Sequence, residues 1–250
     1  MSRDYNQVKH SQLRNAARWL FTVLCTILYA VTVLNSQPNS SIEQSVAIAK
    51  KLARPLDADG FPASEQWSLA PVYKFDADWQ GKNPDPQRAT TVQLLFTADT
   101  LFVRFAAQYR TITVFSDSDK DGRRYQLWDR DVAEVFLQPD SSDPWRYKEF
   151  EVSPNGFWVD LDISHGQNQN LHSQLHRRVS INEKTKTWFA ELALPMNSIT
   201  THFNPKDSWR VNFFRVEGPA EPRFYSSWRP TNSPQPNFHV PEAFGILRFE

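Results

Sequence analysis

The sequence predicts an all-β domain, an antiparallel β-sandwich of jelly-roll-like arrangement, behind a hydrophobic N-terminal segment. The first observation is composition: 9 Trp, 18 Phe and 17 Pro in 250 residues favour short strands and turns over long helices. The second is pattern, because short strand-like segments recur after residue 90 with turn-rich stretches between them. The third is an uncharged run near the N-terminus, which sets the first 36 residues apart from the domain.

Residues 1–36 are predicted to be a signal peptide or a signal anchor. Four basic residues precede the uncharged run 19–34, and a polar stretch follows it. As a helix, this run spans about 24 Å at about 1.5 Å per residue, less than the hydrocarbon core of about 30 Å. A cleaved signal peptide is therefore favoured over a membrane anchor formed by residues 19–34, and either one predicts export.

Residues 37–54 are interpreted as a linker, and residues 55–250 as the sandwich domain. Weak helical periodicity over Ile42–Leu52 predicts a short linker helix. The only cysteine, Cys25, lies in the N-terminal segment. The exported domain is therefore predicted to contain neither disulfides nor thiolate chemistry.

Eight strands are predicted from short runs rich in β-branched and aromatic residues. In chain order these are 91–96, 101–107, 131–137, 147–152, 157–161, 187–194, 209–216 and 245–249. Several alternate apolar and polar residues, so one face is expected to pack inward while the other carries polar groups. The stretch 171–178, which holds His172 and His176, is interpreted as a polar loop rather than a metal-binding helix.

Two classes of function are excluded by composition. The formal net charge is zero, and nucleic-acid binding requires a concentrated basic face. Only 7 glycines are present, and neither GxGxxG nor GxxxxGK[ST] occurs. We therefore expect no nucleic-acid partner and no nucleotide cofactor.

The densest polar cluster lies on the predicted strand 147–152. Tyr147, Glu149 and Glu151 share one face of this strand because side chains alternate with period two. Two adjacent carboxylates beside aromatic residues are suited to accept hydrogen bonds from sugar hydroxyls. The alternative is a solvated sheet face paired with arginine or lysine.

A second cluster lies near the C-terminus, where prolines flank aromatic residues. Trp228 precedes Arg229-Pro230, and Phe238-His239 lies between Pro236 and Pro241. Aromatic rings in proline-rich loops can stand at a surface, where they suit the apolar faces of sugars. The alternative is that Phe238 closes the core and Trp228 fills the mouth of the sandwich.

An acidic string, DSDKDG, suggests a calcium site. Asp117, Asp119 and Asp121 supply alternate carboxylates, as in the first half of a calcium loop. The closing glutamate of an EF-hand is missing, so Asp129 or Asp131 would have to complete the loop. The alternative is a plain acidic turn that holds no cofactor.

Six segments in order resemble the family 9 carbohydrate-binding modules and their DOMON-like relatives. They are LDADGFPASEQWSLA, WDRDVAEVF, YKEFEVSPNG, TWFAELALP, WRVNFFRVE and NFHVPEAFGILRF, and they span about residues 56–250. The resemblance implies a β-sandwich, export and non-catalytic sugar binding, often with structural calcium.

When the site residues of the sugar-binding members are mapped onto this sequence, the resemblance implies that Trp128 and Phe238 sandwich a terminal sugar, with Glu134 as a polar partner. The second ring is a tryptophan in the sugar-binding members and Phe238 here. The strand that offers Arg and Asn to the sugar in those members has Glu151 and Ser153 here. The sugar specificity of the family is therefore not transferred.

The sequence thus favours an exported, non-catalytic protein that binds a mono- or oligosaccharide, with a glycoside hydrolase as an expected partner. A DOMON-type haem or redox module is an alternative, with Met196 and His239 as axial ligands. A glycosidase using Glu149 and Glu151 is disfavoured, because neighbouring positions on one strand project in parallel and cannot flank a bond from opposite sides. An envelope scaffold without a ligand is the remaining alternative.

Overall fold

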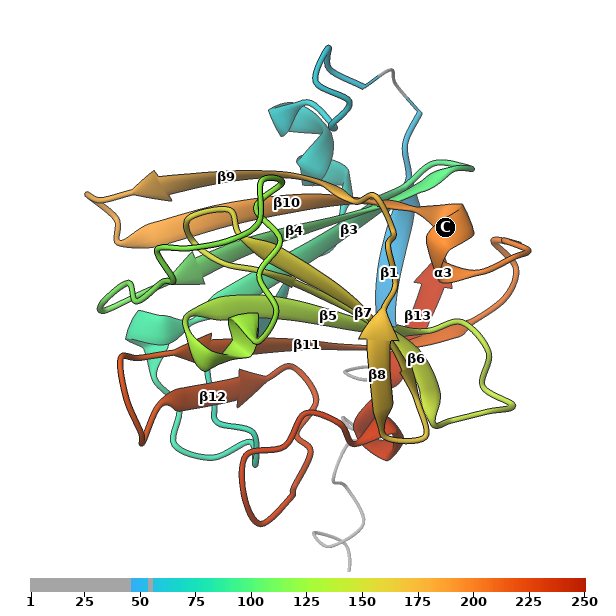
Figure 1. Cartoon of the computed structure of the whole chain (residues 1–250). Coiled ribbons are helices and arrows are strands. Elements are labelled where there is room, and N and C mark those ends of the chain that lie inside the picture. Colours follow the sequence, from blue (N-terminus) through green and yellow to red (C-terminus); the bar gives the residue numbers. More distant parts are fainter. Residues whose placement is uncertain (1–45, 54–55) are drawn as a thin grey trace, which may run out of the picture. The chain divides into compact units, whose positions relative to one another are not determined.

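The structure is a computed structural model that describes residues 46–53 and 56–250. These residues form an all-β domain with a few short helices (Figure 1). The predicted signal or anchor segment, residues 1–36, lies outside the described residues. Within the described ranges, no helix is long and apolar enough to cross a membrane.

The strands and helices of the described residues have the following bounds. The strands are β1 Val46–Lys51, β2 Tyr73–Phe75, β3 Thr90–Phe96, β4 Thr100–Gln108, β5 Val132–Gln138, β6 Arg146–Val152, β7 Trp158–Ser164, β8 Gln167–Asn170, β9 His176–Asn182, β10 Thr187–Pro195, β11 Trp209–Glu217, β12 Phe224–Ser227 and β13 Gly245–Phe249. The helices are η1 Ser64–Leu69, η2 Pro86–Arg88, η3 Leu127–Asp129, α3 Met196–Ile199 and η4 Pro241–Ala243.

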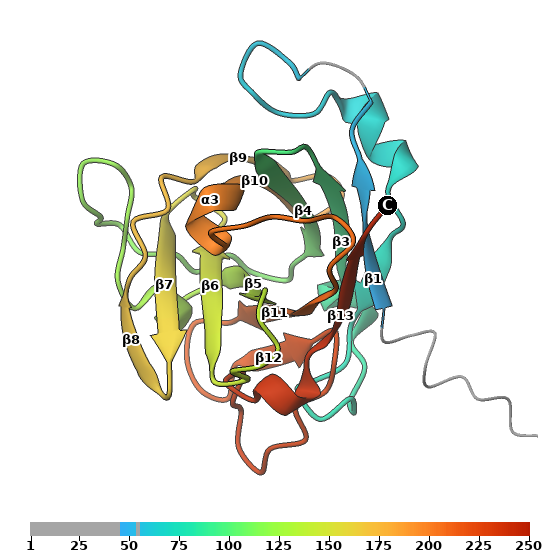
Figure 2. The same cartoon turned by 90° about the vertical axis from the view of Figure 1, so that its right-hand side faces the viewer.

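The strands form one curled, mixed sheet in the order β8-β7-β6-β5-β11-β13-β1-β3-β4-β10-β9. Strand β1 joins the two halves, since Val46–Ala49 pairs with β13 and Lys50–Lys51 pairs with β3. Both pairings are parallel, whereas the other ladders are antiparallel, so the prediction of an antiparallel sheet is wrong at β1. Figure 2 shows the strands curving around a common interior. The predicted all-β class is confirmed, and its strands form one curled sheet.

The predicted linker helix is wrong in its described part. Val46–Lys51 is a strand, and its alternating burial places Ala47 and Ala49 in the core. Pairing with β13 and β3 on both sides satisfies the backbone of this segment, which outweighs a weak helical period.

All eight predicted strands are present, and the largest difference is that β7 continues to Ser164. Five further strands had no usable sequence signal: β1, β2, β8, β9 and β12. Strand β8 reads QNQN and is exposed at every residue, so it shows no apolar alternation. Strand β9 begins at His176, inside the predicted polar loop.

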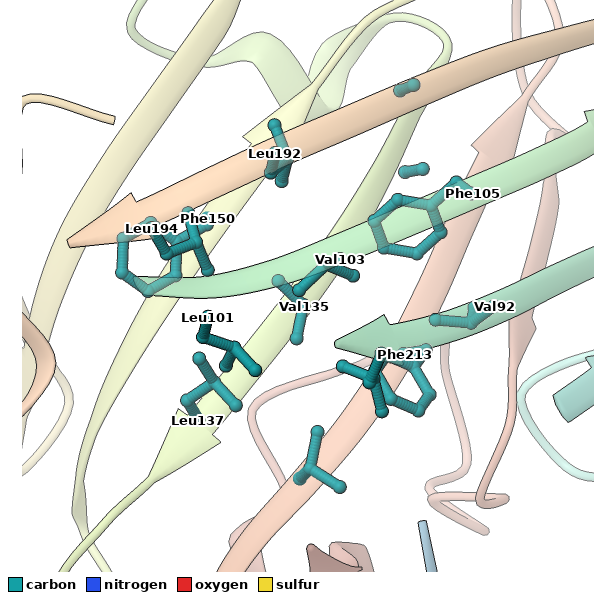
Figure 3. Packing of buried hydrophobic residues seen from close by; sticks show 14 of the residues in the cluster. Val92, Leu101, Val103, Phe105, Val135, Leu137, Phe150, Leu192, Leu194 and Phe213 are labelled. Atoms are coloured by element: carbon teal, nitrogen blue, oxygen red, sulfur yellow. The ribbon is translucent and has the colours of Figure 1, made fainter. Parts of the chain in front are cut away.

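The main core lies between the two halves of the sheet (Figure 3). Phe105 and Leu192 from β4 and β10 face Val135, Phe150 and Phe213 from β5, β6 and β11. Each of these side chains is fully buried. Burial of each contributes about 1.5–3 kcal/mol to stability.

The other face of β5, β6, β7 and β11 carries a second, smaller cluster. Its side chains alternate in sequence with those of the main core. The cluster comprises Leu127, Val132, Phe136, Tyr147, Val159, Leu161, Ile163, Phe214, Val216, Phe238 and Phe244. This face holds the candidate site.

Candidate functional site

Three buried glutamates lie together on the second face. Glu134 on β5 is paired directly with Glu151 on β6, and Glu149 lies two residues earlier on β6, opposite Phe136. Their exposed fractions are 2%, 0% and 2% for Glu134, Glu151 and Glu149. One carboxylate oxygen from each residue lies within 4.8 Å of the other two. The predicted shared face of Glu149 and Glu151 is confirmed, and Glu134 joins it across the ladder.

These carboxylates lack the partners that buried charges need. Oε1 of Glu134, Oε2 of Glu149 and both oxygens of Glu151 have no hydrogen-bond partner as carboxylates. Burial raises the pKa of Glu134 well above its ordinary 4.5, and Glu149 raises it further, while Arg223 lowers it. Burial and the charges of Glu134 and Glu149 likewise raise the pKa of Glu151. The alternative of a solvated sheet face is wrong for these residues.

A pocket of about 270 Å³ opens above Glu134 and Glu149. Its lining comprises Trp128, Glu134, Glu149, Leu161, Asn168, Val216, Arg223, Tyr225, Pro236, Asn237, Phe238 and His239. Glu151 is buried beside these carboxylates and does not line the pocket. The pocket therefore combines aromatic walls with an acidic floor.

Trp128 and Phe238 both line the pocket but offer it different surfaces. Trp128 in η3 is half-buried, and Tyr125 contacts it edge-on with ring centroids 5.3 Å apart. Phe238 stacks on Phe214 with centroids 4.3 Å apart and an interplanar angle of 16°. One face of the Phe238 ring is thus occupied by the protein, and the residue is only 8% exposed.

His239 lies at the exposed rim of the pocket. Its Nδ1 lies 2.8 Å from the hydroxyl of Tyr147, whose ring stacks on Phe136. Burial, together with the charges of Glu149 and Glu242, raises the pKa of the Tyr147 hydroxyl above its ordinary 10. Tyr147 is therefore neutral and holds the His239 ring in place.

Arg223 is a pocket residue that the sequence analysis missed. Its guanidinium donates to the Trp128 carbonyl at 2.7 Å and to the Tyr225 hydroxyl at 2.6 Å, and it pairs with Glu221 at 3.0 Å. These contacts of Arg223 therefore fix the position of η3, which carries Trp128. Asn168, Tyr225 and Asn237 were also missed as pocket residues, since the short strands β8 and β12 and the loop at Asn237 give no periodic signal.

Two predicted residues lie elsewhere. Trp228 packs on Tyr73 and Phe213, with ring centroids 5.7 and 5.4 Å away, beside the main core and outside the pocket lining. Met196 is also buried in the main core, whereas His239 lies at the pocket. The structure therefore does not bring together the axial ligands of the haem alternative.

The predicted calcium loop forms an acidic turn. Asp119 Oδ1 accepts hydrogen bonds from the backbone N–H groups of Asp121 at 2.9 Å and Arg123 at 2.7 Å, and Asp117 lies 3.7 Å from Arg124. Among the described residues, the three glutamates are the one group of at least three candidate ligands close enough to share a metal ion. Calcium binding by Asp117, Asp119 and Asp121 stays a prediction.

The fold is thus a β-domain with a pocket whose walls are aromatic and acidic. The chain belongs to the carbohydrate family 9 binding domain-like family, whose profile matches residues 58–250. This membership makes it a non-catalytic binding module, so the glycosidase alternative is set aside.

The chain is also similar to individual proteins in sequence and in structure. An extracellular protein of Arthroderma benhamiae is 26% identical over 196 residues, which cover 71% of this chain and 85% of the relative. A Bacteroides uniformis protein to which carbohydrate binding has been ascribed has a similar structure, with a TM-score of 0.65, 17% identity, and coverage of 82% of this chain and 99% of its own.

Family 9 modules from Caldicellulosiruptor kristjanssonii also share the fold. The complex with cellotriose has a TM-score of 0.57 and the complex with glucose 0.55, both at 11% identity and over 82% of this chain. The matched regions cover 93% of the chain in the cellotriose complex and 95% of the chain in the glucose complex. At this identity the likeness establishes the fold.

Proposed function

We propose that the protein is an exported carbohydrate-binding protein whose ligand, a monosaccharide or the end of an oligosaccharide, occupies the pocket beside Trp128. The observation that carries the proposal is the meeting of an accessible aromatic ring and buried carboxylates in one pocket. The family and the sugar complexes of its C. kristjanssonii members support it.

Each wall of the pocket suits one part of a sugar. The half-buried ring of Trp128 offers an apolar surface to the C–H face of a pyranose, and burying such a contact contributes on the order of 1–3 kcal/mol. Glu134 and Glu149 face the hydroxyls from the floor. Because Phe214 covers one face of Phe238, Phe238 acts as a side wall against the other edge of the sugar.

The size of the pocket favours a short ligand. At about 270 Å³ it lies just below the range of about 300–1,000 Å³ typical of small-molecule sites. His239 and Asn237 stand at its exposed rim, where a second sugar unit would leave the pocket. The pocket therefore suits a terminal sugar better than the middle of a polymer.

Export is the second part of the proposal. The uncharged run Trp19–Leu34 supports a signal peptide or an anchor, and the A. benhamiae relative is an extracellular protein. An exported sugar-binding module would hold a carbohydrate close to a partner glycoside hydrolase. Detection of the mature N-terminus by mass spectrometry distinguishes cleavage after the run from a retained anchor.

Calorimetric titration of the full chain with glucose, cello-oligosaccharides and other mono- and oligosaccharides tests sugar binding. Trp128→Ala should weaken the affinity for the bound sugar at least tenfold. Leu69→Ala, which changes an exposed side chain in η1 outside the pocket, is the matched control and should bind like the wild type. A folded protein that binds no sugar, or a Trp128→Ala variant with unchanged affinity, would overturn the proposal.

A further inference from the structure

The three buried glutamates need a partner that the described part of the chain does not supply. Directly opposed like charges destabilise a β-ladder, yet Glu134 and Glu151 face each other with Glu149 alongside. Lys148, the neighbour of Glu149 on β6, is engaged by Asp162 at 2.5 Å. Arg215 on β11 pairs with Glu217 at 3.2 Å and lies over Trp188 of the main core.

Arg223 is the one basic side chain that lines the same pocket, apart from the exposed His239. Its three nitrogens are already engaged by Trp128, Tyr225 and Glu221. Arg223 therefore offsets at most one of the three negative charges that the ionised glutamates carry.

Unpartnered oxygens indicate that a ligand belongs among the glutamates. When all three are ionised, four of their six oxygens are buried without a hydrogen-bond partner, because the contact between the carboxyl groups of Glu149 and Glu151 requires a proton on one of them; each of the three side chains is more than nine-tenths buried. Buried acceptors of this kind are normally satisfied by protein, water or an ion. Two of the carboxylates line a pocket open to solvent, so an ion has a path of entry.

The spacing of the oxygens is compatible with calcium. Ca²⁺ binds oxygen at about 2.3–2.6 Å, so two ligands on opposite sides of the ion are about 5 Å apart. The 4.8 Å limit on the distances among the three carboxylate oxygens lies within this span. Mg²⁺ demands a near-ideal octahedron, keeps several of its waters and usually takes only one or two protein carboxylates, so a group of three carboxylates suits calcium better.

We propose that Glu134, Glu149 and Glu151 bind one calcium ion at the floor of the pocket. A divalent cation together with Arg223 balances the three carboxylates. Carboxylates from three residues leave positions of the coordination shell free, since calcium takes 6–8 oxygen ligands. The free positions face the pocket, where water or a pair of sugar hydroxyls completes the shell.

Ion binding by the glutamates stands apart from sugar binding, whereas coordination of sugar hydroxyls rests on the proposed function. The test is therefore made first without sugar. Chelator-treated full chain is titrated with CaCl₂ in a calorimeter. The wild type should bind a calcium ion at the three glutamates, and this binding should be lost, or weakened at least tenfold, in Glu134→Gln and in Glu151→Gln.

Asp119→Asn is the matched control, because it changes the other acidic cluster and leaves the pocket unchanged. It should retain this calcium site. Near-ultraviolet circular dichroism verifies the fold of each variant, and Glu149→Gln replaces any variant that fails to fold. An absence of calcium binding by the wild type, or its loss in Asp119→Asn with retention in Glu151→Gln, would overturn the inference.

Sugar titrations with CaCl₂ and with chelator separate the two proposals. Sugar affinity that falls at least tenfold in chelator supports hydroxyl coordination by the ion. Calcium binding without any sugar binding contradicts the proposed function and leaves the calcium site standing. Sugar binding by a protein that binds no calcium contradicts the calcium site and leaves the proposed function standing.

Discussion

Glu134 and Glu151 lie directly opposite each other on β5 and β6, and both are buried. This pairing places two acidic side chains where a sheet normally holds apolar or oppositely charged pairs. The surrounding cluster is apolar, and the floor of the pocket therefore holds a group of acidic side chains that pay a burial cost, whether they ionise or take up protons, inside an aromatic frame. Such an arrangement lowers stability unless a ligand or ion offsets it.

Replacing Glu151 by glutamine should therefore stabilise the ion-free protein. The substitution keeps the shape of the side chain and removes one buried charge, so in chelator at pH 8 we expect a gain of about 1 kcal/mol or more. In excess calcium the same variant should gain less stability from the ion than the wild type does. Thermal unfolding measures both effects.

The control for this experiment is Glu65→Gln, which removes a charge from an exposed position in η1. Its melting temperature should match that of the wild type in both buffers. A Glu151→Gln variant that is less stable than the wild type in chelator would show that the carboxylate has a favourable partner of its own.

Arg223→Met should separate sugar binding from ion binding. The variant loses the charged hydrogen bond that holds the Trp128 carbonyl, worth about 1.5–3 kcal/mol, so sugar affinity should fall at least tenfold. Calcium affinity should be equal or higher, because a positive charge has left the pocket. Calorimetric titration measures both.

Arg248→Met, at an exposed position of β13, should change neither affinity and serves as the control. Weaker calcium binding in Arg223→Met would contradict this expectation. It would indicate that Arg223 holds the glutamates in position, an effect larger than its electrostatic repulsion of the calcium ion.

Phe150→Ala should show the contribution of the main core. Phe150 is fully buried between the two halves of the sheet, so its truncation leaves a cavity and should cost about 3–5 kcal/mol. Urea denaturation measures the free energy of unfolding. Leu69→Ala, with an exposed side chain, should stay within about 0.5 kcal/mol of the wild type, and an equal loss in both variants would contradict the core described here.

Stability should fall at acid pH partly through Asp85. Burial raises the pKa of Asp85, but Arg88 at 2.7 Å and Arg110 at 2.8 Å outweigh it and hold the pKa below the ordinary 3.8. The stabilisation is therefore present above pH 3.8 and is lost as the pH falls through the lowered pKa of the folded state. Urea denaturation of the wild type and Asp85→Asn from pH 6 downward should show a smaller loss in the variant, and parallel curves would contradict this assignment.

Local sequence pattern predicted the parts of the fold that depend on one strand at a time. Alternation placed Glu149 and Glu151 on one face, and the segments around Phe105, Phe150 and Phe213 are strands as expected. The pattern could not show that Glu134 faces Glu151, because register between strands is a long-range property.

The resemblance to a known family supplied residues that pattern alone did not. It selected Trp128 and Phe238, and both line the pocket. It could not supply Arg223, which reaches the Trp128 carbonyl from a distant segment, nor exclude Trp228, whose ring packs at the main core. Strand β1 was missed because its six residues are stabilised by pairing on both sides rather than by their own propensity.

A crystal structure of the full chain with the sugar that binds best in the titrations tests the central claim most directly. We predict one sugar unit in the pocket, with its apolar face on Trp128 and its hydroxyls directed toward Glu134 and Glu149. A sugar bound away from this pocket, or an empty pocket at a saturating sugar concentration, would contradict the account.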